Sequence, residues 1–346
     1  MARRFTTGAE EPDVLGLWDN VLTLGSDNQI GMPTFGRSDQ VSWAPRTGRG
    51  MYVMNSTEYL QNLTADNPTE LYFGFAVRFS ALAAATFFVA TNDTPGTFTN
   101  YCSLYLNANG SISLNRVTTA LATSPSALIS ADTWYYMEVW LKPLNSNGRF
   151  VLKVDGSIPL TCDVTGDTTN DLELISAYQF KGIATTTLTS FDDIVVNDAS
   201  TGVNNTYPGM VRLLPIRGRS VGQYDQWVRG GVDLGSNPAQ VSGGGFDFSM
   251  LQTPNADYKS TFVPDIPDLP AGATIKNVAL STKARVQSGA GVLANMLRAN
   301  GTDSISADHT LTSSWKYYQD VWSINPEDSG AWAEADLANL QIGVSS

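Results

Sequence analysis

The sequence predicts an all-β protein with two domains, and three observations carry this prediction. Apolar residues recur at every second position in many short segments, which is the period of a half-buried strand. Turn-forming pairs such as Asn109-Gly110 and Asp155-Gly156 separate these segments. The chain has 346 residues, which is too long for one ordinary hydrophobic core and fits two domains of sandwich size.

The first domain is predicted over residues 1–200. One clearly alternating segment carries Leu71, Phe73, Phe75, Val77 and Phe79. A hairpin is predicted around Asn109-Gly110, and a second hairpin joins residues 135–141 to residues 150–154. A closing strand is expected over 190–198, and the polar, turn-rich stretch at 197–209 is the predicted boundary between the domains.

The second, smaller domain is predicted over residues 201–346 and is again rich in strands. It begins with a strand at 210–216, and Asn300-Gly301 marks a tight turn. Trp332, Ala335 and Leu337 fall at helical spacing. They predict one short helix before a last strand that contains Ile342.

Composition and charge restrict the classes of partner. A hydrophobic content of 42% with 16% charged residues is typical of a folded protein. The chain has 33 acidic and 21 basic residues, a net charge of −12, which repels nucleic acid and anionic membranes. Arg3-Arg4 is followed by no apolar signal region, so we expect synthesis in a cytoplasm without export. Cys102 and Cys162 are expected to be free, buried thiols.

The order of the strands in the first domain resembles a known fold. Trp134-Tyr135-Tyr136 opens one strand, and Val154-Asp155-Gly156 ends its partner. This arrangement is similar to the concanavalin-A-like, laminin-G-type jelly roll. The resemblance implies a jelly-roll sandwich followed by a smaller β-rich domain.

Several segments taken in order resemble structural proteins of tailed bacteriophages. They are residues 190–198, 222–227, 258–260, 331–337 and 340–344. The resemblance implies a non-enzymatic virion protein on the particle surface, as a tail, fibre or head-decoration component. It also implies contacts with other virion proteins, homo-oligomers with trimers favoured, and weak attachment to host glycans. We expect no cofactor, apart from the calcium considered below. The alternative is a glycan-binding or glycan-cleaving depolymerase of the same fold.

No catalytic constellation stands out in the sequence. His309 is the only histidine, which excludes multi-histidine metal sites, and we expect it in a solvated loop. Glucanases of the concanavalin-like fold use two carboxylates on one strand, and Asp171 and Glu173 are the nearest match. They lack flanking aromatic residues, and the interpretation favoured here is structural. We therefore expect no enzymatic activity.

One strand is predicted to carry a face that could contact a ligand or a partner. Trp134, Tyr136, Glu138 and Trp140 alternate with apolar residues. Aromatic rings beside a carboxylate are typical of sugar-binding surfaces, whereas the competing interpretation is packing in a core or an interface. Trp332, Arg217 and Arg219 are further candidate interface residues.

Asp192 and Asp193 stand in the predicted closing strand. In lectin-like folds an acidic residue near this strand can hold calcium, which needs several oxygen ligands. No Asp-x-Asp-x-Asp-Gly loop surrounds the pair. The interpretation favoured here is that one carboxylate faces solvent and the other accepts backbone N–H groups.

Overall fold

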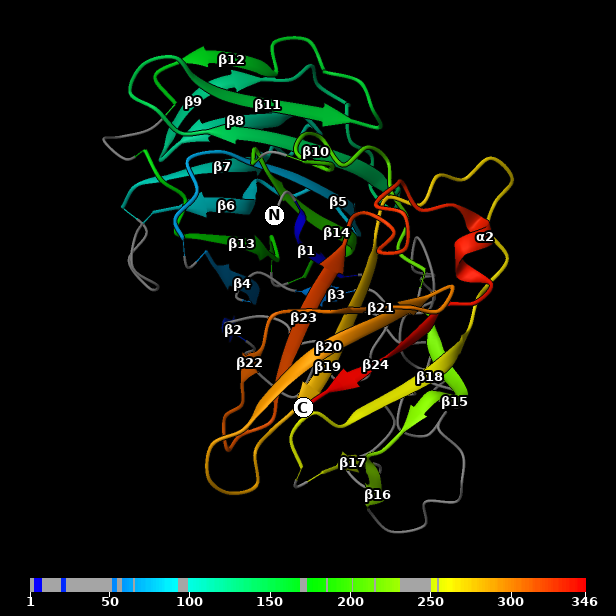
Figure 1. The fold of residues 1–346 in the computed structure, drawn as a ribbon. Helices are drawn as coiled ribbons and strands as arrows, with labels where there is room; N and C mark the ends of the chain where they lie inside the picture. Colours follow the sequence, from blue (N-terminus) through cyan, green and yellow to red (C-terminus); the bar gives the residue numbers. More distant parts are fainter. Residues whose placement is uncertain are drawn as a thin grey trace. The chain divides into compact units, whose positions relative to one another are not determined.

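The chain forms two compact units, the first ending at Leu213 and the second beginning at Leu214. The computed structural model describes residues 3–7, 20–22, 52–54, 58–64, 66–92, 99–168, 173–184, 186–200, 202–214, 216–230, 250–253 and 255–346. The strands pair antiparallel, and among these residues α2 (Glu334–Leu337) is the only helix (Figure 1). The all-β prediction is confirmed.

The first unit contains two sheets, and we call the first of them sheet A. Its strand order is β1-β14-β5-β10-β11-β12, and β3 also pairs with β14. The strands are β1 (Arg3–Thr7), β3 (Tyr52–Met54), β5 (Leu71–Phe79), β10 (Tyr135–Lys142), β11 (Gly148–Val154), β12 (Asp163–Gly166) and β14 (Thr189–Asp198).

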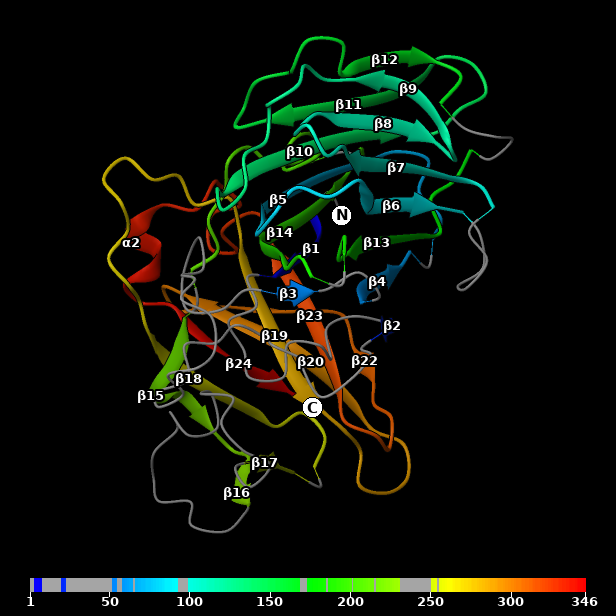
Figure 2. The same cartoon turned by 180° about the vertical axis from the view of Figure 1, so that it is seen from behind.

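The second sheet of this unit, sheet B, has the strand order β2-β4-β13-β6-β7-β8-β9. Its strands are β2 (Asn20–Leu22), β4 (Tyr59–Leu63), β6 (Ala85–Thr91), β7 (Tyr101–Leu106), β8 (Ile112–Arg116), β9 (Thr119–Thr123) and β13 (Ala177–Lys181). β10 and β11 of sheet A run nearly parallel to β7 and β8 of sheet B (Figures 1 and 2), as expected for aligned packing of two twisted sheets.

An aromatic core joins the two sheets. Phe73 and Phe75 of β5 contact Phe88 of β6 and Phe180 of β13, with ring centroids 4.9 Å apart for Phe73–Phe88 and 5.1 Å for Phe75–Phe180. These rings are fully buried, so the apolar side of each alternating strand faces the other sheet. The first unit is thus a jelly-roll sandwich, as predicted.

Both cysteines are free and buried in the first unit, which confirms the prediction. Burial raises the pKa of the Cys102 thiol to about 12 and that of the Cys162 thiol to about 11. Both side chains therefore stay protonated near neutral pH and behave as small apolar groups.

Both predicted hairpins form. After the second hairpin, at Asp155-Gly156, both residues have positive φ, as a type I′ turn requires. Between β7 and β8, in contrast, Gly110 has positive φ and Asn109 does not. The backbone N–H of Asn107 donates to the backbone carbonyl of Ser111, so this loop spans more residues than a two-residue turn.

The second unit is built around a sheet with the order β15-β18-β24-β20-β21, and β22 also pairs with β20. β19 and β23 form a separate pair that crosses β20 and β24 at an angle (Figure 1), and β16 pairs with β17. The strands are β15 (Arg217–Asp225), β16 (Val228–Gly230), β17 (Met250–Gln252), β18 (Lys259–Asp265), β19 (Val278–Ala284), β20 (Val292–Ala299), β21 (Thr302–Ile305), β22 (His309–Thr310), β23 (Lys316–Trp322) and β24 (Gln341–Ser345).

The predicted short helix before a last strand is confirmed as α2 followed by β24. Leu337 of α2 packs in a core with Leu297 and Ile342. Asp336 accepts the backbone N–H of Ala333 at 2.7 Å, which satisfies one of the free donors at the helix start.

Candidate functional site

The predicted aromatic face lies on the outer side of sheet A. Tyr136, Glu138 and Trp140 alternate with core residues of β10, and Trp134 precedes the strand. Tyr136 and Glu138 are 1% and 2% exposed, whereas Trp140 is half-buried. Tyr136 and Glu138 are therefore buried within the first unit, and Trp140 is the member of this face on β10 that stays partly exposed.

A covering segment, residues 206–213, closes this face from within the same unit. The backbone N–H of Gly209 donates to Glu138 Oε1 at 2.7 Å. Pro208 lies directly over Gly74, where an added Cβ would come within 3.0 Å of Pro208 Cγ. The division between the two units consequently follows Leu213 instead of falling at residue 200.

Trp140 is held in a cluster of polar and aromatic side chains. Its Nε1 donates to Glu70 Oε1 at 2.7 Å, and the Tyr72 hydroxyl donates to the same oxygen at 2.8 Å. The rings of Trp140 and Tyr72 stack 5.7 Å apart, and Arg149 Cζ lies 4.8 Å from the Trp140 ring. Burial is the main cause that raises the pKa of the Tyr72 hydroxyl. These contacts fix the position of the Trp140 ring.

Asp192 and Asp193 are fully buried at a bulge of β14. Asp192 Oδ1 accepts the backbone N–H of Asp193 at 2.7 Å, and Asp193 Oδ1 accepts that of Leu213 at 2.8 Å. Both carboxylates thus accept backbone N–H groups, and neither faces solvent. Within the described part of the chain, no group of three His, Cys, Asp or Glu side chains could hold a metal ion.

The remaining candidate residues from the sequence analysis do not form a common site. Glu173 is exposed, and Asp171 lies outside the described residues. Arg217 and Arg219 lie in β15, where Arg219 pairs at 3.0 Å with an exposed aspartate of β18. Trp332 is 4% exposed and packs in the core of the second unit, so its ring is not on the surface.

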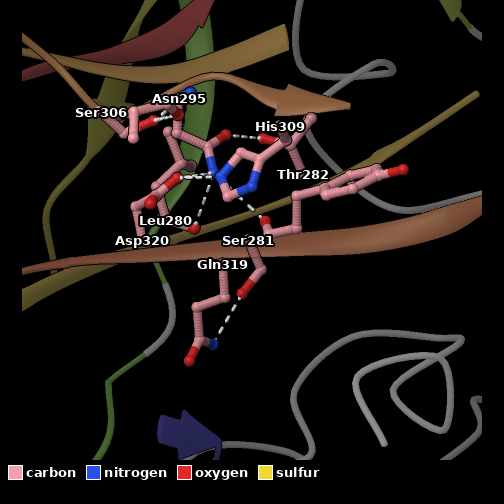
Figure 3. Close-up of polar contacts among 10 residues, drawn as sticks. Leu280, Ser281, Thr282, Asn295, Ser306, His309, Gln319 and Asp320 are labelled. Atoms are coloured by element: carbon pink, nitrogen blue, oxygen red, sulfur yellow. Dashed lines mark hydrogen bonds and ion pairs between the residues drawn. The ribbon is translucent and has the colours of Figure 1, made fainter. Parts of the chain in front are cut away.

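His309 lies in β22 and not in a solvated loop, which corrects the expectation for this residue. Its Nε2 is 2.7 Å from Asp320 Oδ2, and the same oxygen accepts Asn295 Nδ2 at 2.8 Å (Figure 3). Asn295 Oδ1 accepts the Thr282 hydroxyl, and its Nδ2 also donates to the carbonyl of Tyr318. These bonds join β20 to β19 and β23, which gives the cluster a structural role.

A second cluster of polar side chains that bind one another includes residues from three segments named in the sequence analysis, 222–227, 258–260 and 340–344. Asp303 Oδ2 accepts the Tyr224 hydroxyl at 2.8 Å and pairs with Lys259 at 3.0 Å, while Asp303 Oδ1 pairs with Arg298. Burial pushes the pKa of Asp303 upward, but hydrogen bonds from Lys259, Tyr224 and Arg298 outweigh it and leave that pKa below its usual value. Gln341, in the last of these segments, accepts the Thr261 hydroxyl at 2.9 Å. This cluster ties β15, β18, β20 and β21 together.

The outer face of sheet B keeps several buried polar atoms without partners among the described residues. One row of register-paired residues, the polar row, crosses the sheet from β4 to β8: Gln61, Gln179, Val89, Ser103 and Asn115. Paired residues point to the same side of a sheet. Phe88 and Phe180 alternate with this row and face the core, so the polar row faces away from the core.

Gln61 and Gln179 are both 1% exposed and share one hydrogen bond, from Gln179 Nε2 to Gln61 Oε1 at 3.0 Å. Gln61 Nε2, Gln179 Oε1, Ser103 Oγ and Asn115 Oδ1 have no hydrogen-bond partner among the residues that the structure describes. Exchanging nitrogen and oxygen in both amides still leaves one donor and one acceptor unpaired. Such atoms are uncommon in folded proteins, and four in one row require an explanation.

Partly exposed side chains flank the polar row. Tyr101 and Tyr105 stand on either side of Ser103 in β7, and Lys181 of β13 pairs in register with Tyr59 of β4. All four are half-buried. Burial lowers the pKa of Lys181, and no charged neighbour contributes to that shift.

The sequence reasoning missed this site although β13 carries a signal for it. Tyr178 and Phe180 alternate there with Gln179 and Lys181, which is the pattern of a strand with one apolar and one polar side. Polar residues on an outer face are ordinarily solvated, so this pattern alone does not indicate a site.

Comparisons with known proteins give similarity to solved structures only. No family model and no curated protein matches the chain. The chain is similar to the alginate lyase Aly36B, with 14% identity over 44% of this chain and 82% of the lyase at a TM-score of 0.33. It is similar to the Trypanosoma rangeli sialidase, with 15% identity over 44% of this chain and 26% of the sialidase at a TM-score of 0.34. It is also similar to the carbohydrate recognition domain of Emp46p, with 12% identity over 47% of this chain and 85% of that domain at a TM-score of 0.31.

These matches correct one expectation from the sequence. Enzymes are among the similar structures, namely an alginate lyase and a sialidase, so the expectation that the chain lacks enzymatic activity is not retained. The similarity is too low to assign either activity. Among the described residues, no helix is long and apolar enough to cross a membrane.

Proposed function

We propose that the first unit binds carbohydrate on the outer face of sheet B. The observation that carries this proposal is the Gln61–Gln179 pair, which keeps one donor and one acceptor unpaired while both side chains are buried. A sugar hydroxyl donates and accepts at once, so one or two hydroxyls can satisfy both atoms. Because both atoms are buried, the side chains around the amides have to shift for a sugar to reach them. Leaving a buried polar group unsatisfied costs about 1–3 kcal/mol, and a bound sugar would recover part of that cost.

The aromatic residues around the polar row fit the same ligand. Tyr59, Tyr101 and Tyr105 are half-buried, so parts of their rings remain accessible beside the amide pair. The C–H faces of sugar rings pack on aromatic rings while their hydroxyls bind polar atoms. Amides that fix the hydroxyls, together with tyrosines that support the ring, form the combination that a pyranose needs.

Glycan cleavage is a second candidate function, and Lys181 is the observation that favours it. Its lowered pKa brings the neutral amine closer to physiological pH, where it can accept a proton from a water molecule that attacks the glycosidic carbon. Tyr59 stands opposite Lys181 in the neighbouring strand, and its hydroxyl can donate a proton to a leaving group. Cleavage would use the same face as binding.

The experiment is a glycan array probed with the full chain, followed by affinity measurements on the strongest ligand. We expect wild-type binding, and a loss of about tenfold in affinity for Gln61→Ala and for Gln179→Ala, because each removes polar contacts that are buried with the ligand. Gln319→Ala, in the second unit, is the matched control and should bind as wild type. Binding that is unaffected by both substitutions in the polar row, or no binding to any glycan, would overturn the proposal.

Cleavage is tested on the same ligands by following new chain ends. Lys181→Gln should abolish product formation and leave binding measurable, if Lys181 moves a proton. Product formed at the wild-type rate by Lys181→Gln would remove the second candidate.

The virion setting remains a proposal that rests on the phage resemblance. In that setting the chain would be displayed on a particle, in contact with other virion proteins, and the face of sheet B would attach the particle to host glycans. Detection of the chain on the surface of purified particles supports this setting, and its absence from them contradicts it.

A further inference from the structure

Sheet B is almost free of charge. Its described strands contain no Asp or Glu, and their only charged residues are Arg116 and Lys181. Arg116 pairs in register with the core-facing Cys102 and forms a salt bridge with Asp167. Lys181 is therefore the charged side chain that remains on the outer face of these strands.

Lys181 has the environment of a cation that lacks its anion. It is half-buried, burial is the sole cause of its lowered pKa, and no described carboxylate forms an ion pair with it. A desolvated charge without a partner is costly, and proteins ordinarily pair it or keep it fully solvated. The neighbouring Gln179 and Tyr59 are neutral and do not neutralise it.

Position links this cation to the amide pair. Gln179 and Lys181 are two residues apart on β13, so their side chains leave the same face about 6.6 Å apart along the strand. That spacing is comparable to the width of one sugar ring. An acidic substituent of a sugar placed over the amide pair, or of the neighbouring sugar, could therefore reach the partly exposed Lys181.

We propose that the carbohydrate bound at this face is anionic, and that Lys181 pairs with its carboxylate or sulfate group. This inference rests on the proposed glycan-binding function. The net charge of −12 opposes polyanions at long range, so selection has to come from the local contact and not from a basic surface. The ligand class is an acidic polysaccharide, either a polyuronate or a sulfated glycan.

The experiment uses the full chain and polysaccharides in matched charged and neutral forms. Polygalacturonate and polymannuronate are each compared with their carboxyl-reduced forms, and dextran sulfate is compared with dextran. Wild type should bind at least one charged form about tenfold more tightly than its neutral counterpart. Lys181→Gln should lose that preference and Lys181→Arg should keep it, and Lys142→Gln on sheet A is the matched charge control. Thermal unfolding verifies that each variant is folded.

The outcomes separate this inference from the proposed function. If neutral and charged forms bind equally and Gln179→Ala weakens both, the glycan site stands and the anionic ligand is excluded. If Lys181→Gln keeps the wild-type preference for the charged form, Lys181 is not the partner and the inference fails. If no polysaccharide binds in any form, both proposals fall. The carboxylate and sulfate arms identify which anion is selected.

Discussion

At the scale of single residues, the outer face of sheet B carries groups that do not favour folding. Lys181 is a desolvated cation without an anion, and Gln61 and Gln179 keep unpaired amide atoms at 1% exposure. By contrast, Asp303 and His309 have close polar partners in the second unit. Residues that reduce stability without an internal compensation are typical of binding sites, where a ligand supplies the missing partner.

Lys181→Met should therefore raise stability at neutral pH. The folded-state pKa of Lys181 lies below its unfolded value, so between these two values the unfolded chain binds more protons and wild-type stability rises with pH. The methionine variant lacks this rise. Its advantage in free energy of unfolding should be largest near neutral pH and shrink towards about pH 10.4, the ordinary lysine value.

Urea unfolding at a series of pH values measures this effect. Lys142→Met, on the outer face of sheet A, is the control for losing a positive charge. The account of Lys181 would be contradicted if the gain in free energy of unfolding of Lys181→Met over wild type did not change with pH. It would also be contradicted if Lys181→Met were less stable than wild type at neutral pH.

At the scale of elements, the covering segment explains why Tyr136 and Glu138 of sheet A are buried. β5 is buried on both sides, because residues 206–213 cover its outer side while sheet B covers its inner side. Glu138 fixes this segment through the Gly209 amide. Residues 206–213 therefore belong to the first unit, although their sequence neighbourhood is polar and turn-rich and predicts a linker.

Glu138→Ala should loosen the covering segment, whereas Glu138→Gln keeps an acceptor for the Gly209 amide. We expect the alanine variant to lose about 1–3 kcal/mol of stability, since a buried hydrogen bond to a carboxylate is removed. Limited proteolysis should cut it faster within residues 199–213 than wild type or the glutamine variant. Equal cleavage of the alanine and glutamine variants would show that Glu138 does not hold the segment.

The sequence alone predicted those strands, turns and helices whose residue pattern is local. The alternation in β5, the hairpin of β10 and β11 and the helix α2 follow from side-chain period and turn residues. It was insufficient wherever burial depends on distant segments. Tyr136 and Glu138 have the alternation of an open face, and only the return of residues 206–213 buries them. The pairing of Gln61 with Gln179 joins positions 118 residues apart, which no local pattern reveals.

At the scale of the whole molecule, the chain consists of two units that each have a core of their own. The first is a sandwich filled with aromatic rings, and the second packs Trp332 and Leu337 against its main sheet. The binding proposal concerns the first unit alone. The second unit contains four of the five segments on which the expectation of a phage protein rests, and the polar groups around Asp303 and His309 in this unit bind one another.

The predicted oligomer belongs to this scale and rests on the phage resemblance. Light scattering on the purified full chain should give three times the 37.2 kDa mass of one chain if the trimer forms. A single-chain mass that persists at high protein concentration would contradict the trimer.

The most direct test of the central claim is a crystal structure of the full chain with the oligosaccharide that binds most tightly. We predict sugar density on the outer face of sheet B, with ring hydroxyls within hydrogen-bond distance of Gln61 Nε2 and Gln179 Oε1. Sugar bound elsewhere on the chain, with the polar row still without partners, would contradict the account.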